Sequence, residues 1–171
     1  MRKVILVSLL LIATRLNAQQ LNLQSLDKFA DKAKDKVVMD LDQASLQLAS
    51  SFLSSEKKDE AAARKISSDL KGIYVRVFEF DRAGVYTEAD LKPVRDQLKA
   101  PQWKRILTVQ DDEEVGIWTY SEAGMPAGIA IVVAGANELT VVNLVGPIRP
   151  QDLSNIGGQF GIPEIKNLKK D

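Results

Sequence analysis

The chain has 171 residues, of which 45% are hydrophobic and 27% are charged, and its 23 basic residues balance 23 acidic ones. This composition is typical of a globular domain and excludes a disordered chain. The sequence contains no Cys and no His. That absence excludes disulfides, Cys nucleophiles, histidine-based catalytic triads and most zinc sites.

The N-terminal segment has the layout of a secretory signal peptide. Arg2 and Lys3 make a positive start, an apolar run follows over 4–13, and the small residue Ala18 stands before Gln19. This layout predicts cleavage between Ala18 and Gln19, and export to the periplasm or out of the cell. An apolar run of about ten residues is too short for a membrane span, which takes about twenty. No Cys follows it, so we expect no lipid anchor on the mature protein.

Cleavage at that bond would remove three of the 23 basic residues and leave 20 against 23 acidic ones, a formal charge of −3. No basic stripe remains that would indicate nucleic acid as a partner. The remaining length suits one domain with its own core. We therefore expect a signal peptide over 1–18, a single domain over 19–164 and a basic C-terminal tail over 165–171.

The spacing of apolar residues predicts both helices and strands. Repeats of three and four residues predict helices over 25–35, 43–54, about 60–71, 88–100 and from 150 onward. Alternation predicts strands over 37–42, 73–80, 103–110, 115–121, 127–134 and 139–145. The last four strands are joined by turns short enough for hairpins.

Several residues are expected to start, bend or end these elements. Ser25 would cap the first helix, and Gly72 would end the third as a C-cap glycine. Thr87 and Asp90 have the spacing of a capping box, and Pro93 should kink or restart the helix that follows. Gly84 is typical of a turn.

Together these elements predict an α+β fold: a single domain with a mainly antiparallel sheet of about five to six strands packed with four to five helices. The strand Ile129–Val133 is apolar on both faces, and Leu139–Val145 is nearly so. Both faces must therefore be covered, by helices or by another molecule. Asn143 lies within the second of these strands and needs hydrogen-bond partners there.

Two groups of residues are candidates for binding. The acidic turn 111–114 offers oxygen ligands for Ca²⁺, but adjacent residues of one short turn cannot all converge on an ion, which favours a solvated turn that protects a strand edge. Trp103, Trp118 and Tyr120 lie on neighbouring predicted strands. They would form an aromatic platform for a ligand or partner if exposed, although aromatic residues on strands more often fill the core.

A chain without His or Cys retains carboxylate pairs as catalytic candidates. Asp40 and Asp42 share a strand face, and with Glu79 they suggest a carboxylate-dependent hydrolase. One of the pair would need a pKa raised by burial, and neither has an apolar context on that face. We therefore expect no catalytic residues, no cofactor and no bound metal.

Four stretches of the sequence resemble one bacterial family. They are Gly72–Phe80 (GIYVRVFEF), Trp103-Lys-Arg, Glu138–Ile148 (ELTVVNLVGPI) and Leu153–Pro163. The chain is similar through them to domain-of-unknown-function family 4252, over roughly Leu23 to Pro163. The resemblance implies an exported protein of a Gram-negative-type bacterium. Some members carry a lipoprotein Cys that this sequence lacks, and the resemblance brings no catalytic residues.

The function that these observations favour is an exported, non-catalytic binding or protein-interaction module that works through a sheet face or edge. Its partner would be another envelope protein or a second copy of itself. Two alternatives stay open: the carboxylate-dependent hydrolase, and a small-ligand binder that uses the strand aromatics Trp118, Tyr120 and Trp103.

Overall fold

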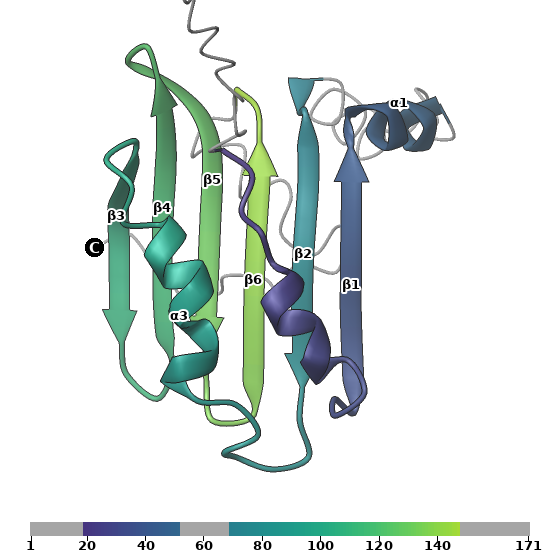
Figure 1. Cartoon of the computed structure of the whole chain (residues 1–171), viewed down its shortest axis with the longest axis vertical. Coiled ribbons are helices and arrows are strands. Elements are labelled where there is room, and N and C mark those ends of the chain that lie inside the picture. The colour runs from purple at the N-terminus through teal and green to yellow at the C-terminus, as the bar shows by residue number, and fades with distance from the viewer. Residues whose placement is uncertain (1–18, 52–68, 148–171) are drawn as a thin grey trace, which may run out of the picture.

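A computed structural model describes residues 19–51 and 69–147, which build one sheet with helices packed on it (Figure 1). The strands are β1 (Asp35–Asp42), β2 (Gly72–Glu79), β3 (Trp103–Gln110), β4 (Glu114–Glu122), β5 (Met125–Ala134) and β6 (Glu138–Val145). All neighbouring strands are antiparallel, in the order β1-β2-β6-β5-β4-β3. The predicted antiparallel α+β fold is confirmed, and each predicted strand end lies within two residues of the observed one.

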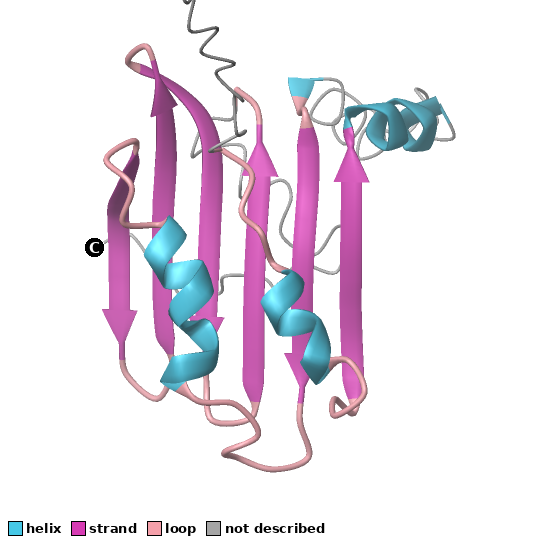
Figure 2. Ribbon diagram, in the orientation of Figure 1, coloured by secondary structure: helices cyan, strands magenta, loops and turns pink. Residues whose placement is uncertain are grey.

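The described residues contain three helices, not the four to five predicted (Figure 2). They are the 3₁₀ helix η1 (Gln24–Phe29), α1 (Gln43–Ser51) and α3 (Glu88–Gln97). The helix predicted from 150 onward and nearly all of that predicted over 60–71 lie outside the described residues, as do the predicted signal peptide and C-terminal tail.

The start of the first helix differs from its prediction. It is a short 3₁₀ helix that ends at Phe29, and Leu23 occupies its N-cap position. Ser25 lies inside the helix, and its buried hydroxyl has no hydrogen-bond partner among the described residues. Oδ1 of Asn22, just before the N-cap, accepts a hydrogen bond of 3.0 Å from the backbone N–H of Gln24. Sequence reasoning thus placed the N-cap at Ser25, two residues after the observed position at Leu23.

Gly72 and Pro93 also behave differently from expectation. Gly72 is the first residue of β2, and a Cβ there would lie 2.7 Å from the ring of Tyr74, so the glycine makes room for that ring. Pro93 lies inside α3, which continues from Glu88 to Gln97 without restarting. The predicted capping box of this helix is confirmed, since the carboxylate of Asp90 accepts a 2.8 Å hydrogen bond from the backbone N–H of Thr87.

Two hydrophobic clusters lie on opposite faces of the sheet. The helix-covered face, turned toward the reader in Figure 1, is packed by Leu26 and Phe29 of η1 and by Leu91 and Val94 of α3. The second face contains these buried strand residues: Ile73, Val75, Ile117, Ile129, Ile131, Val142 and Leu144. Leu46 of α1 and Leu70 join this second cluster. The strands predicted to be apolar on both faces are therefore buried on both.

Asn143 lies on the helix-covered face and is fully buried. Its Oδ1 accepts a hydrogen bond of 2.8 Å from the backbone N–H of Leu21, and its Nδ2 donates to the carbonyls of Gln19 and Ile129 at 3.1 and 3.3 Å. The predicted satisfaction of this amide is confirmed. Its partners fix the first described residues of the chain onto β6.

Candidate interaction site at the edge of the sheet

The three carboxylates proposed for a hydrolase have different surroundings. Asp40 binds Arg76 through both oxygens, each at 2.9 Å, and Asp42 accepts a hydrogen bond of 2.8 Å from the backbone N–H of Ser45 at the start of α1. Hydrogen bonds from Ser45 lower the pKa of Asp42, the opposite of what a general acid requires. Glu79 lies opposite Asp35 in the sheet. Asp35 is five residues, or about 17 Å, from Asp40 along β1, so Glu79 is far from the other two carboxylates.

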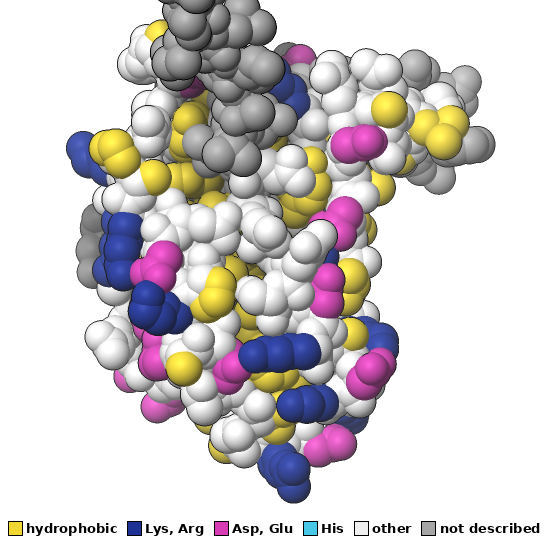
Figure 3. All heavy atoms as spheres, in the orientation of Figure 1, with side chains coloured by type: hydrophobic (Ala, Val, Ile, Leu, Met, Phe, Trp, Pro, Cys, Tyr) yellow, Lys and Arg dark blue, Asp and Glu magenta, His cyan; other side chains and the backbone are white. Residues whose placement is uncertain are grey.

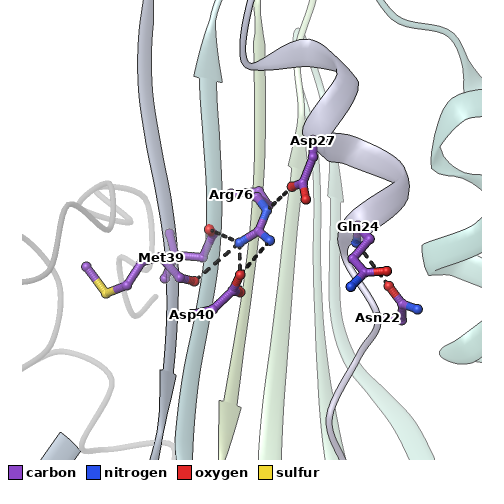
Figure 4. A network of polar contacts seen from close by, with 7 residues as sticks. Asn22, Gln24, Asp27, Met39, Asp40 and Arg76 are labelled. Atoms are coloured by element: carbon purple, nitrogen blue, oxygen red, sulfur yellow. Dashed lines mark hydrogen bonds and ion pairs between the residues drawn. The ribbon is translucent and has the colours of Figure 1, made fainter. Parts of the chain in front are cut away.

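Arg76 gathers the most connected polar network of the described residues (Figure 4). Its Nε donates to Asp27 of η1 at 2.6 Å, and Nη1 and Nη2 donate to Asp40 of β1. Nη1 also donates to the carbonyls of Met39 and Val75 at 3.3 and 2.9 Å. The guanidinium therefore has protein partners around it and joins η1 to the outer strand β1.

The charge of Arg76 is buried, since its side chain is 2% exposed, whereas Asp27 and Asp40 are 47% and 54% exposed. Burial lowers the pKa of Arg76, but the hydrogen bonds to Asp40 and Asp27 more than offset it, so the net pKa lies above the ordinary value. Every nitrogen of this guanidinium donates to an acceptor of the protein itself. We interpret the network as structural.

The acidic turn after β3 is solvated for most of its length. Asp111, Asp112 and Glu113 are exposed, whereas Glu114 begins β4 and accepts two hydrogen bonds of 2.8 Å from Arg95 of α3. The hydrogen bonds from Arg95 lower the pKa of Glu114. Within residues 19–51 and 69–147, no group of three or more acidic side chains is placed to hold a metal ion.

The three aromatic residues proposed as a binding platform lie in the core. Trp103, Trp118 and Tyr120 are 6%, 4% and 7% exposed. The rings of Trp103 and Tyr120 meet edge to face at 5.2 Å, and the guanidinium of Arg105 lies 4.8 Å from the Trp118 ring. These contacts hold β3 against β4 and leave little ring surface for a ligand. A ligand-binding role for the three stays a prediction.

The edge of the sheet at β3 carries exposed apolar side chains. Ile106 and Val109 are 47% and 45% exposed. The register with β4 shifts between Arg105 and Leu107, which leaves Ile106 without a partner residue on β4. Because β3 is the last strand of the sheet, the backbone groups on its outer side have no neighbouring strand among the described residues.

Opposite charges lie at the two ends of this strand. Lys104 and Arg105 are at its start, and Asp111 and Asp112 follow its last residue; all four side chains are exposed. Figure 3 shows both basic and acidic side chains along the side where β3 lies. We call the segment from Lys104 to Asp112 the β3 edge.

The opposite edge, β1, has a different character. Asp35, Asp40 and Asp42 make it acidic, and the last two are engaged by Arg76 and by the start of α1. Helix α1 follows β1 directly and lies past the end of that strand (Figure 1). β1 exposes one large apolar side chain, Val38, whereas β3 exposes two, Ile106 and Val109, so β3 is the edge with more exposed apolar side chains.

Sequence reasoning missed both Arg76 and the β3 edge. Arg76 stands between apolar residues in a strand, a pattern that indicates a buried charge with partners elsewhere in the chain. The edge could not be assigned, because alternation over 103–110 does not say whether one neighbouring strand or two will flank it. Of the residues proposed at the cleavage bond, Ala18 lies outside the described residues, and Gln19 donates from Nε2 to Glu122 at 2.9 Å.

The described residues include no helix long and apolar enough to cross a membrane. No curated protein and no solved structure is detectably similar to the chain. A family profile, described as Domain of unknown function (DUF4252), matches residues 29–156 and so includes all six strands. The match covers most of the chain and agrees with the resemblance carried by Gly72–Phe80 and Glu138–Ile148. The chain therefore belongs to the family Domain of unknown function (DUF4252).

Proposed function

We propose that this protein is an exported, non-catalytic interaction module that binds a protein partner by adding an extended strand to the β3 edge. The observation that carries the proposal is the exposure of Ile106 and Val109 on the terminal strand of an open sheet. In strand addition, backbone hydrogen bonds supply affinity and alternate side chains supply specificity. Both are available on β3.

The edge is favoured over the sheet faces as the binding surface. On the second face, Ile129, Val142 and Leu144 are each 0% exposed, so this face has no apolar surface left to offer there. The helix-covered face is filled by η1, α3 and the segment that Asn143 holds. A partner would have to displace packed side chains to reach either face, whereas the β3 edge is accessible as it stands.

Two further observations support the rest of the proposal. The carboxylates that a hydrolase would need are occupied by Arg76 and by the start of α1, which favours a binding role over catalysis. The layout of residues 1–18 favours export. The acidic and basic ends of the β3 edge would orient a partner and set its strand direction.

Selection from a displayed library of random peptides on the purified protein tests this mode of binding. Enriched peptides should alternate apolar and polar residues, and Ile106→Lys should weaken their binding by about tenfold or more, because an edge lysine opposes strand addition. Val38→Lys is the matched control, since Val38 is also 47% exposed but lies on β1. Peptides that bind Ile106→Lys as tightly as the wild type would refute binding at this edge.

A further inference from the structure

We propose that the partner of the β3 edge is β3 of a second copy of this chain, paired antiparallel across a two-fold axis. Two six-stranded sheets would then join into one continuous sheet. This inference rests on the proposed function and names the partner. In a contact between identical antiparallel strands related by a two-fold axis, the start of one strand faces the end of the other. The two ends of β3 must therefore be complementary in charge and shape.

The apolar residues of β3 suit such a contact. With Thr108 on the axis, Leu107 of each copy lies opposite Val109 of the other. The two residues are two apart and share a face, and their partners on β4 are Ile117 and Val115. Pairing would cover Val109, which is 45% exposed, and would continue the apolar second face from one sheet into the next.

The charges of the β3 edge agree with the same register. It brings the basic start of one strand, with Lys104 and Arg105, toward the acidic turn of the other copy, with Asp111 and Asp112. Symmetry repeats this contact at the other end, so each basic end lies near an acidic end. Opposite charges on facing strands stabilise a pair, and like charges destabilise it.

The β1 edge lacks this self-complementarity. Two β1 strands paired antiparallel over their full length would set Asp35 opposite Asp42, a like-charge contact at both ends. A contact from β3 to β1 of the next copy would join different surfaces, leave a free edge at each end, and grow into an open chain. Helix α1 at the end of β1 and the engagement of Asp40 by Arg76 disfavour it.

The bulge at Ile106 sets the strength of the association. A bulge interrupts regular pairing, and Gln110 of one copy lies opposite the bulged Ile106 of the other, so continuous strand addition is confined to the short stretch from Leu107 to Val109. A contact of that length gives a dimer that forms and dissociates with concentration and weakens as salt screens its charge pairs.

Sedimentation of the purified chain over a wide concentration range tests the pairing. The wild type should show a monomer–dimer equilibrium whose dissociation constant rises with salt. Lys104→Glu and Asp112→Lys should each weaken the dimer by about tenfold, because each reversal brings like charges together at both ends of the contact. An equimolar mixture of the two variants should recover dimers of near wild-type affinity. In the mixed dimer, the glutamate introduced at position 104 faces the lysine introduced at position 112, and the original charges meet at the opposite end.

Controls on the other edge carry the same charge changes. Lys36→Glu and Asp35→Lys, both on β1, should leave the dissociation constant within about twofold of wild type, and circular dichroism should show every variant folded. A chain that stays monomeric throughout, a mixture that does not recover dimers, or species larger than a dimer would each overturn the inference. If the chain is monomeric yet Ile106→Lys abolishes peptide binding, the edge function stands and only the second copy is excluded as partner.

Discussion

Arg76 is the largest side chain that the described residues bury almost completely. Its two carboxylate partners lie 49 and 36 positions away in the chain, on η1 and β1. A buried guanidinium with fewer partners would be left partly desolvated and unneutralised, which is strongly destabilising. Asp27 and Asp40 lie at the surface, where water solvates their outer sides. Loss of Arg76 therefore leaves these carboxylates hydrated, whereas loss of either carboxylate leaves the buried guanidinium with an unpaired donor.

This asymmetry predicts the outcome of a double-mutant cycle. Asp40→Asn should lower the free energy of unfolding by about 1–3 kcal/mol in the wild type, because Arg76 loses a charged acceptor. In a chain that carries Arg76→Met, the same substitution should change it by less than about 0.5 kcal/mol, since no buried charge then depends on Asp40. Urea unfolding of the four chains measures both values. An equal change in the two backgrounds would contradict the coupling.

Asp90 makes stability depend on pH. The hydrogen bond from Lys28, with those from Thr87, lowers the pKa of Asp90 from 3.8 to about 2. Between these values the unfolded chain binds more protons than the folded one, so this contribution is complete above pH 3.8 and is lost as the pH falls through about 2.

Asp90→Asn should therefore be less stable than the wild type near neutral pH, and the difference should shrink as the pH is lowered from about 4 toward about 2. Denaturant unfolding at a series of pH values checks this. Asp35→Asn, at an exposed position on β1, provides a control for a general effect of removing a carboxylate. A difference that stays constant down to about pH 2 would exclude Asp90 as its source.

The β4–β5 hairpin holds a backbone conformation that its sequence suits only in part. Ala123 and Gly124 form a two-residue loop with φ values of +51° and +79°. Positive φ at both positions is typical of a type I′ turn, which favours Asn followed by Gly. Glycine meets this requirement, but the Cβ of Ala123 is strained there.

Ala123→Asn should raise the free energy of unfolding by about 0.5–1 kcal/mol, because Asn tolerates this conformation better than Ala. Gly124→Ala should lower it by a similar amount, since it adds a second strained residue to the same turn. Thermal unfolding of both variants gives the sign of each change. If Ala123→Asn lowers the melting temperature, strain at position 123 is not what limits this hairpin.

The strands could be predicted from the sequence, and their order could not. Alternation over 73–80 and 139–145 is local, so it locates β2 and β6 within a residue or two. Their pairing, Gly72 with Val145 through Glu79 with Glu138, joins segments far apart in the chain, and no local pattern specifies it. The sheet edges follow from this order, so the β3 edge could not be predicted either.

The candidate sites show the same limit. Asp40 and Asp42 do share a strand face, as their spacing predicts. What each carboxylate binds depends on contacts with Arg76 and Ser45 that form only in the fold. Burial of Trp118 likewise depends on how the helices cover the sheet, so its place in the sequence favours the core without deciding between core and surface.

The proposed export and the absence of cysteine bear on the whole molecule together. A chain with no Cys has no disulfide to stabilise it outside the cytoplasm, so its stability must come from packing on both faces of the sheet. A domain of ordinary stability, about 5–15 kcal/mol, can be maintained in this way.

Two measurements on the protein purified from its host cells test these expectations. Intact mass should show a chain that begins at Gln19, because Ala18 offers signal peptidase a small residue. Its melting temperature should be the same with and without reductant, because there is no disulfide to break. A mass that retains residues 1–18 would reject cleavage at this bond, and Ala18→Arg, which should block it, provides the control.

The hydrogen bonds between Asn143 and the first described residues determine how late in synthesis the domain can complete its folding. Its partners Gln19 and Leu21 lie 124 and 122 positions earlier in the chain, and β2 also pairs with β6 as its inner neighbour. Because a chain is synthesised from its N-terminus, β1 and β2 are made long before β6, the strand that completes their side of the sheet. Contacts of such long range form late and slowly. We therefore expect the nascent chain to stay unfolded until β6 has been made, which is the state that the proposed export through a narrow channel would require.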